Sequence, residues 1–262
     1  MEVNKRWGKV LWQEMTRPEF EQALWEQAMV IIPTGSTEQH GPHLPVSCDI
    51  NNSYSIALEA ARRIEDFRLI VAPPVWSGFS PHHIDFPGTI SLHLHTFEDL
   101  MIQVCMSIYR HGFRKVFILN GHGGNNAPLN SIVQQLVQEK VYVATVTWWN
   151  LVVQELWDIG ESPSGGMSHA CEAETSLQML LQPQAVNLDA RVKEMHPPLM
   201  SMAKNDFRES GPIAYGFDFK RQTQHGVFGD PTLATLEKGQ RIFDAGVNKV
   251  LLALREYYAL EW

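Results

Sequence analysis

The chain is poor in cysteine and has no long apolar run. Its 262 residues include three cysteines, Cys48, Cys105 and Cys171, and no Cys-x-x-Cys pair. Such an odd and sparse set excludes a disulfide-stapled fold and fits a reducing compartment. No apolar segment is long enough to cross a bilayer, and residues 1–7 lack the apolar core of a signal peptide. We therefore expect a cytoplasmic protein with no membrane partner.

Basic residues are also few. Lys and Arg number 21 against 29 Asp and Glu, a formal net charge of −8, and no block of basic side chains stands out. Because nucleic-acid-binding proteins present clustered positive charge, this composition argues against a nucleic-acid partner. The length suits one large domain with a sizeable core, and no repeat or linker divides it. We expect a single domain over residues 1–262.

The chain does contain a regular alternation of short apolar runs and amphipathic segments. This alternation predicts an α/β fold with a largely parallel sheet. The expected strands are 28–33, 68–72, 115–120 and 141–148, and the expected helices are 17–26, 52–64, 96–111, 128–139, 170–181 and 232–260. Residues 183–230 show no such pattern, and an irregular stretch of this length usually shapes a binding site or is covered by a partner.

Ligand-type side chains follow the first expected strand. Glu38 and His40 stand two residues apart, and in an extended segment alternate side chains point the same way. A turn through Gly41 and Pro42 would bring Asp49 back to the same place. Carboxylate oxygen and imidazole nitrogen together suit zinc, manganese or iron. The alternative is a polar loop with a capping aspartate.

A second motif follows another expected strand. The run 115–120 ends in Gly121-His122-Gly123-Gly124, where the glycines allow other groups to approach closely. Ligands of open α/β sheets bind outside the carboxyl ends of the strands. Two strand ends that carry ligand-type residues therefore predict one shared site.

A third motif lies where a glycine-rich loop becomes a helix. Ser168 is a candidate cap, and His169, Glu172 and Glu174 cluster at the helix start. Helical spacing places His169 and Glu172 on one face and Glu174 elsewhere, unless the helix begins later. Glutamates in a first turn also stabilise the helix dipole without any catalytic role. A thiol nucleophile at Cys171 is the weaker hypothesis, because it leaves the first two motifs unexplained.

With these motifs in hand, the chain resembles the creatinine amidohydrolase (creatininase) family. Five segments in matching order carry the resemblance: 35–41, 86–89, 120–125, 169–176 and 226–231. The resemblance implies a three-layer α/β/α fold and a centre of two divalent metal ions. Members hydrolyse amide-type C–N bonds in small cyclic or formylated compounds, and they usually assemble as hexamers.

The resemblance also implies roles for particular residues. Glu38 and His122 would hold one metal ion, His40 would hold the other, and Asp49 would bridge both. His169 would lie near the substrate and is expected to act in catalysis. The expected substrate contacts are Ser80, His83, Gly123 and Trp149, of which Trp149 matches a pocket tryptophan of the family.

Two departures from the family pattern change the expected substrate and ligand set. Creatininase proper has a metal-binding glutamate where this chain has Gly124, and a Trp-Asp pair that contacts creatinine where this chain has Gly165 and Gly166. We expect Glu174 to complete the second metal site, with Glu172 as the second choice and as a further catalytic candidate. Creatinine itself is not the expected substrate.

The expected function is metal-dependent hydrolysis of a C–N bond in a small molecule, an amide, cyclic amide or formamide. A metal-bridged hydroxide would attack the carbonyl carbon, and His169 would protonate the leaving nitrogen. Zinc is the first choice for both ions, with manganese or iron as alternatives. The first alternative function is ring-opening of a cyclic ketone or lactone in sugar or inositol breakdown. The second is a metal-free binding protein, which the intact ligand residues speak against.

Overall fold

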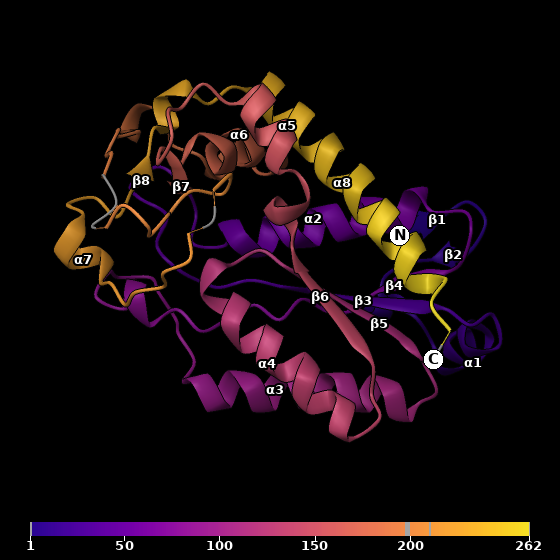
Figure 1. Cartoon of the computed structure of the whole chain (residues 1–262). Helices are drawn as coiled ribbons and strands as arrows, with labels where there is room; N and C mark the ends of the chain where they lie inside the picture. The colour runs from indigo at the N-terminus through magenta and orange to yellow at the C-terminus, as the bar shows by residue number, and fades with distance from the viewer. Residues whose placement is uncertain (1, 197–199, 210, 262) are drawn as a thin grey trace.

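Four parallel strands form the centre of the molecule. The computed structural model describes residues 2–196, 200–209 and 211–261. Its central sheet has the strand order β4-β3-β5-β6, and every neighbouring pair is parallel (Figure 1). The strands are β3 (Met29–Thr34), β4 (Leu69–Val71), β5 (Lys115–Asn120) and β6 (Val143–Thr147). All four expected strands are thus confirmed, with ends that shift by a few residues.

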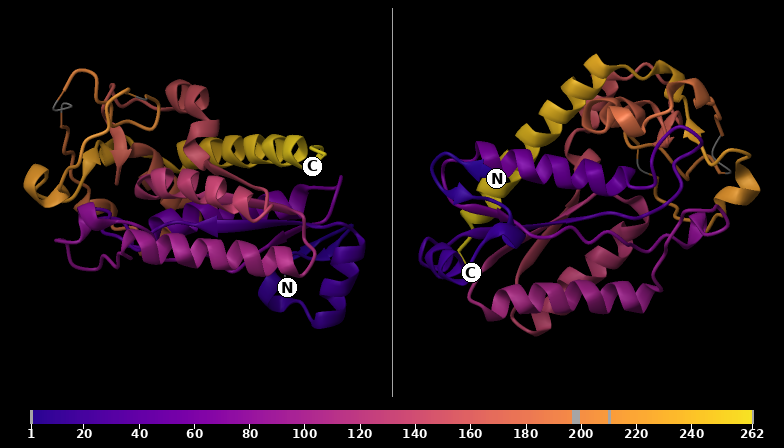
Figure 2. Two further views of the ribbon diagram at one scale, coloured as in Figure 1. Left: turned by 60° about the horizontal axis from the view of Figure 1, so that its bottom comes forward. Right: turned by 180° about the vertical axis from the view of Figure 1, so that it is seen from behind.

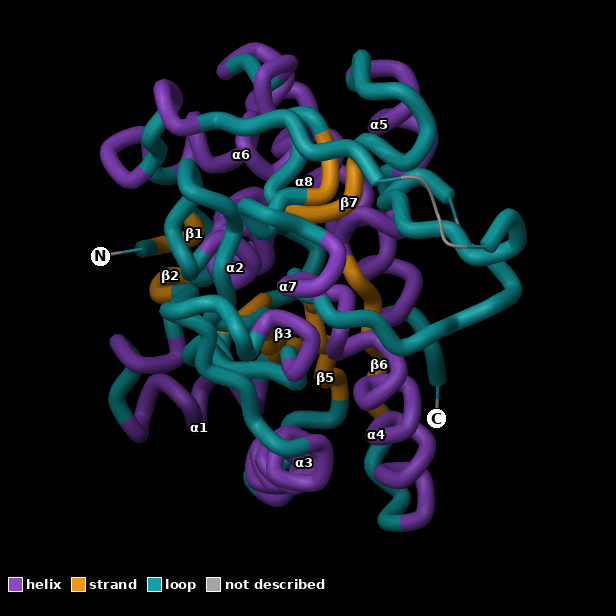
Figure 3. The backbone as a smooth tube through the Cα atoms, turned by 90° about the vertical axis from the view of Figure 1, so that its left-hand side faces the viewer, coloured by secondary structure: helices purple, strands orange, loops and turns teal. Residues whose placement is uncertain are grey.

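Helices cover both faces of this sheet, as Figures 2 and 3 show. Along β3, Met29 and Ile31 pack into one apolar core and Val30 and Ile32 into the other. A strand buried on both faces in this way is typical of a parallel sheet between two helical layers. The first core is closed by α2 (Cys48–Arg63) and α8 (Leu236–Tyr258), and the second by α1 (Arg17–Trp25), α3 (Leu94–Arg110) and α4 (Asn126–Gln138). The three-layer α/β/α prediction is confirmed.

A smaller set of elements lies at one end of the sheet. It contains α5 (Val153–Ile159), α6 (Glu172–Leu181), α7 (Phe219–Gln222) and the antiparallel pair β7 (Met167–His169) and β8 (Phe228–Gly229). The helix α6 packs against α8 and α2. A second antiparallel pair, β1 (Val3–Asn4) and β2 (Gly8–Lys9), lies near the N-terminus. Within the described residues, no helix is both long and apolar enough to cross a bilayer.

Several element boundaries differ from the predictions. The helix α2 begins at Cys48 instead of Asn52, so its first turn includes Asp49. The helix α6 begins at Glu172 instead of Ala170, because residues 167–169 pair with β8. The short helix α5 was not predicted. Residues 183–230 are largely irregular, as expected, and positions 197–199 and 210 lie outside the described residues.

Candidate metal centre

The candidate ligands converge at the carboxyl ends of β3 and β5. The parallel register pairs Thr34 with Asn120, the last residue of each strand. The segments that follow the two strands therefore leave the sheet side by side. Glu38 and His40 lie on the segment after β3, and His122 lies on the segment after β5. Parallel strands thus bring together residues that are more than eighty positions apart in the sequence.

Asp49 lies between two imidazole rings. Its Oδ1 atom is 3.1 Å from His40 Nε2, and its Oδ2 atom is 3.1 Å from His122 Nδ1. The same nitrogen of His122 is 3.1 Å from Glu38 Oε2. Each oxygen of the Asp49 carboxylate therefore faces a different imidazole, which is the arrangement of a carboxylate that bridges two ions.

The donor set fits metal ions better than it fits hydrogen bonds. His40 Nε2 and Asp49 Oδ2 are buried and form no hydrogen bond of acceptable geometry within the described residues, although possible partners lie 3.1 Å away. Two ligand atoms that are each about 2.1 Å from one ion stand about 3.0–3.4 Å apart. The observed separations match this value, and the oxygen and nitrogen donors suit zinc, manganese and iron.

Without a metal ion, protons take the place of the cations. Burial lowers the pKa of His122, but the carboxylates of Glu38 and Asp49 outweigh burial and raise this pKa to about 10. Burial raises the pKa of Asp49, but the His40 and His122 rings outweigh it and lower this pKa below its usual range. The metal-free centre is thus a buried cluster of imidazolium and carboxylate groups, in which metal ions could replace the imidazolium protons.

Glu174 approaches the centre from α6. Its Oε1 atom lies 3.6 Å from His40 Nε2, and its side chain is almost fully buried. The ligand atoms of His40, His169 and Glu174 lie within 4.8 Å of one another. Because α6 begins at Glu172, His169 lies in β7 and not in the helix, so helical spacing does not separate His169 from Glu174.

Glu172, by contrast, points away from the centre. Its carboxylate accepts hydrogen bonds from the backbone nitrogens of Glu161 and Ser162, at 2.8 to 3.1 Å, and from the Ser162 hydroxyl at 2.6 Å. It also forms a buried ion pair with Lys238. We therefore do not retain Glu172 as a catalytic residue or as a metal ligand, since the later helix start places it among structural partners.

A cavity of about 920 Å³ opens onto the centre. Three of the four expected substrate contacts, His83, Gly123 and Trp149, line this cavity. Ser80 is buried and is not among the lining residues; instead its hydroxyl donates a hydrogen bond of 2.5 Å to Glu38 Oε2. Ser80 therefore orients a candidate metal ligand, and no surface of the cavity is contributed by it.

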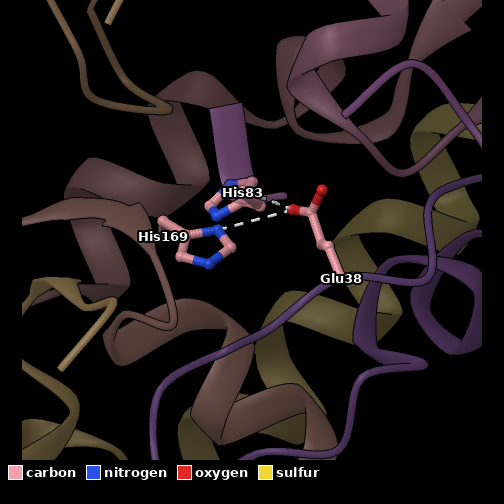
Figure 4. A group of neighbouring side chains, drawn as sticks. All are labelled: Glu38, His83 and His169. Carbon is pink, nitrogen blue, oxygen red and sulfur yellow. Dashed lines mark ion pairs between the residues drawn. The ribbon is translucent and has the colours of Figure 1, made fainter. Parts of the chain in front are cut away.

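Two imidazoles face the second oxygen of Glu38 (Figure 4). His83 Nε2 lies 3.4 Å and His169 Nδ1 lies 3.7 Å from Glu38 Oε1. The two rings stack, with centroids 4.3 Å apart. Burial, followed by nearby imidazoles, holds the pKa of each ring well below its usual range, so both rings are neutral. The site thus combines a ligand cluster with two uncharged imidazoles.

Comparison with known proteins decides the family. Residues 13–254 match the model of the creatinine amidohydrolase family, described as creatininase. The chain belongs to the creatininase family. It is 34% identical over 223 residues to the mycofactocin precursor peptide peptidase of Mycolicibacterium smegmatis, covering 84% of this chain and 81% of that protein. The relatives are named as hydrolases, and this chain is a hydrolase of the creatininase family.

Two further members show the range of the creatininase family. The chain is 29% identical over 255 residues to the 3-dehydro-scyllo-inosose hydrolase of Thermotoga maritima, covering 90% of this chain and 79% of that protein. A solved structure described as creatininase Mn superposes with a TM-score of 0.78 at 26% identity, over 96% of this chain and all of that one. The resemblance drawn from the sequence motifs is therefore confirmed.

Gly124 marks where this chain departs from creatininase proper. A Cβ atom at this position would lie 2.4 Å from the Phe79 carbonyl oxygen, 2.5 Å from His122 Nε2 and 2.9 Å from His82 Cε1. The His82 ring lies almost parallel to that of His122, with centroids 5.5 Å apart. A glutamate at position 124 would clash with these groups, so a ligand of any second metal ion would have to come from elsewhere in the chain.

The sequence motifs missed most of the cavity wall. Lys204 to Phe207 and Ile213 to Phe219 line the cavity, and both stretches belong to the segment without periodicity. Phe207 stacks on Trp149 with ring centroids 4.3 Å apart, and Phe219 lies 3.9 Å from the ring of His83. The clustering of aromatic residues in an irregular segment was the available signal for these contacts.

Proposed function

We propose that the chain is a dinuclear metal hydrolase that cleaves an amide-type C–N bond. The observation that supports this proposal is the position of Asp49, whose two carboxylate oxygens face the imidazoles of His40 and His122. In the proposed ligand set, Glu38 and His122 would hold one ion, His40 and Glu174 would hold the other, and Asp49 would be shared by both. Zinc is the first choice for both ions, with manganese or iron as alternatives.

Two bound ions would supply an activated water molecule and a Lewis acid for the substrate carbonyl group. His169 is neutral, buried and adjacent to Glu38, so it is suited to move a proton between the attacking water and the leaving nitrogen. His83, Gly123 and Trp149 are proposed to contact the substrate from the cavity wall.

The cavity supports a substrate larger than creatinine. Its volume of about 920 Å³ lies at the upper end of the range for small-molecule sites. Its wall includes stacked Trp149 and Phe207 on one side and Phe219 on another. A flat or apolar group next to the scissile amide would pack against these rings. Because one relative is named a peptide peptidase, we include peptide-like amides in the proposed class.

Ring-opening of a cyclic ketone is the second candidate function. It is favoured by the similarity to a protein named 3-dehydro-scyllo-inosose hydrolase. The same carboxylate and imidazole cluster could serve attack on a ketone or an amide carbonyl. We also propose that the chain acts as one catalytic unit in the cytoplasm and assembles as a homo-oligomer, with a hexamer as the expected form.

A substrate panel with wild type and His169→Ala tests this function. The zinc-loaded enzyme is incubated with formamides, cyclic amides, short peptides and cyclic ketones, and released amine, formate and acid are measured. We expect release of amine or formate, and a kcat for His169→Ala that is lower by about 10²–10⁴-fold at unchanged metal content. Acid release from ketones alone would favour the second candidate. Loss of metal in His169→Ala would contradict the proposed proton-transfer role.

A further inference from the structure

The side chain of Gln39 touches both neutral imidazoles of the site. Gln39 is buried, and in the sequence it stands between the candidate ligands Glu38 and His40. Its Nε2 atom is 2.9 Å from His83 Nδ1 and 3.1 Å from His169 Nε2. No role was expected for this residue from the sequence.

Two backbone groups fix the orientation of the Gln39 amide. Gly41 N–H can only donate, and it lies 2.9 Å from Gln39 Oε1. The Gly226 carbonyl can only accept, and it lies 3.0 Å from Gln39 Nε2. Exchanging the amide oxygen and nitrogen would therefore break both hydrogen bonds. Gly226 has φ +75°, and a Cβ there would lie 2.0 Å from Gln39 Oε1, so glycine is required for this contact.

The protons of the two rings follow from this orientation. His169 Nε2 lies 2.8 Å from the backbone oxygen of Gln39, which only accepts, so this nitrogen carries the proton of His169. One hydrogen of the Gln39 amide goes to Gly226, and the other goes to His83 Nδ1. The 3.1 Å contact of Gln39 Nε2 with His169 Nε2 then joins two donors and is not a hydrogen bond. Since His83 Nδ1 accepts, it carries no proton, and the N–H group of the His83 ring is at Nε2.

We propose that Gln39 is a positioning residue that sets the tautomers of the two rings. Its side chain leaves His83 with an N–H group at Nε2, and its backbone oxygen holds the N–H of His169 at Nε2, so that Nδ1 is the free nitrogen of the neutral His169 ring. His83 Nε2 and His169 Nδ1 both face Glu38 Oε1. His83 Nε2 is 3.4 Å from Glu38 Oε1, longer than a good hydrogen bond, so its N–H is available to the substrate oxygen. The catalytic meaning of this arrangement rests on the proposed function, whereas the tautomers themselves do not.

The two tautomers determine which ring nitrogen accepts a proton and which donates a hydrogen bond during the reaction. As the oxygen of water forms its bond to the carbonyl carbon, one water proton passes to His169 Nδ1, which makes the ring an imidazolium. His83 Nε2–H donates to the carbonyl oxygen as negative charge develops there. When the C–N bond breaks, its electron pair stays on nitrogen, and His169 Nδ1 returns the proton to that nitrogen. The neutral ring is then restored.

Nitrogen NMR tests the tautomers without any substrate. The zinc-loaded full chain is labelled with ¹⁵N-histidine, and long-range ¹H–¹⁵N correlations distinguish protonated from bare ring nitrogens. His83→Gln and His169→Gln assign the two rings. We expect a protonated Nε2 and a bare Nδ1 in both wild-type rings. A proton on Nδ1 of either ring would overturn the proposal, whether or not a substrate has been found.

Gln39→Glu supplies the matched perturbation. A carboxylate accepts where the amide donates, so the proton of His83 should move to Nδ1 and leave Nε2 bare. Thr89→Val is the control, because Thr89 accepts a hydrogen bond from the Gln39 backbone nitrogen at 3.1 Å and does not touch the amide. We expect the control to keep the wild-type tautomers. An unchanged His83 tautomer in a folded, metal-loaded Gln39→Glu protein would refute the role of the Gln39 side chain.

A double-mutant cycle links the tautomer to the reaction once a substrate is known. Gln39→Glu should lower kcat by about 10²–10³-fold with a small change in KM, as expected for loss of one oxyanion donor. In a His83→Gln background the side-chain amide offers its own N–H, so adding Gln39→Glu should have little further effect on kcat. Additive losses would contradict the assignment, even if the hydrolase activity itself is confirmed.

Discussion

Glu172→Gln separates a structural role of this glutamate from a catalytic one. The wild-type carboxylate is fully buried and accepts hydrogen bonds from the backbone of Glu161 and from the backbone and hydroxyl of Ser162, and it pairs with Lys238. Glutamine has the same size but only one acceptor atom, and its NH₂ group would face donors. An NH₂ group in place of Oε1 would lose the Lys238 ammonium and one of the two bonds from the Glu161 backbone nitrogen, whereas an NH₂ group in place of Oε2 would face both donors of Ser162.

The expected cost follows from these contacts. Each buried donor left without a partner costs about 1–3 kcal/mol, and breaking a buried ion pair costs about 3–5 kcal/mol. Lys238 keeps the Leu233 carbonyl and the exposed Glu161 carboxylate as partners, so we expect a loss near the lower end, about 3 kcal/mol. For a chain of this size, that loss lowers Tm by about 6–12 °C.

Thermal unfolding of the zinc-loaded protein, followed by circular dichroism, measures this shift. Metal content and kcat at a temperature far below the transition should stay near wild type. Glu174→Gln is the matched control, since it lies on the same helix two residues away and should change metal content instead. An unchanged Tm together with a kcat lowered by 10²-fold or more would refute the structural role of Glu172.

Two further predictions concern the centre itself. Gly124→Ala should lower the free energy of unfolding by about 1–3 kcal/mol and weaken metal binding, because the added Cβ meets the Phe79 carbonyl and the rings of His82 and His122. An unchanged Tm and an unchanged metal affinity would contradict this close approach. Metal loading at pH 7 should release about two protons, from His40 and His122. Burial lowers the pKa of each ring, but Cys48 and Asp49 raise the pKa of His40, and the Glu38 and Asp49 carboxylates raise that of His122. This release, measured by calorimetry in buffers of different ionisation enthalpy, should fall as the pH rises through about 10, and a value near zero at pH 7 would argue against the protonated cluster.

The pH dependence of the metal-free chain has the sign expected for a raised pKa. His122 titrates at about 10 when folded and near 6.5 when unfolded. Its contribution to stability is therefore fully present below about pH 6.5 and is lost as the pH rises through about 10. Bound metal replaces the proton, so the loaded protein should not show this loss.

The sheet and its flanking helices were predictable from local patterns. Largely apolar runs of five to eight residues identified the strands, and the spacing of apolar side chains identified the main helices. The start of α2 was missed because its first turn is polar and Ser47 makes no side-chain cap. The start of α6 was missed because residues 167–169 form a strand with a partner about sixty positions away.

The boundary of α6 decided which glutamate faces the site. Ala170 adopts the left-handed conformation, with φ +50°, between the end of β7 and the start of α6. Local propensity does not predict a left-handed alanine, so the sequence could not choose between Glu172 and Glu174. The strand-end rule, in contrast, brought Glu38, His40 and His122 together correctly.

Long-range contacts account for the rest of what the sequence did not reveal. The hydrogen bond from Ser80 to Glu38 and the contact of Gln39 with Gly226 join segments that are 42 and 187 positions apart. The aromatic side of the cavity comes from a segment without periodicity. Such contacts depend on how loops fold over the sheet, and the periodicity of helices and strands in the sequence does not predict them.

The most direct test of the account is the amount of bound metal per chain, measured by elemental analysis on wild type and on Glu174→Gln. Both proteins are purified after incubation with zinc, manganese or iron and are checked for an unchanged fold by circular dichroism. We predict about two ions per chain in wild type and about one in Glu174→Gln, because the variant loses a ligand of the second site only. No bound metal in wild type under any of these conditions would contradict the proposed dinuclear centre.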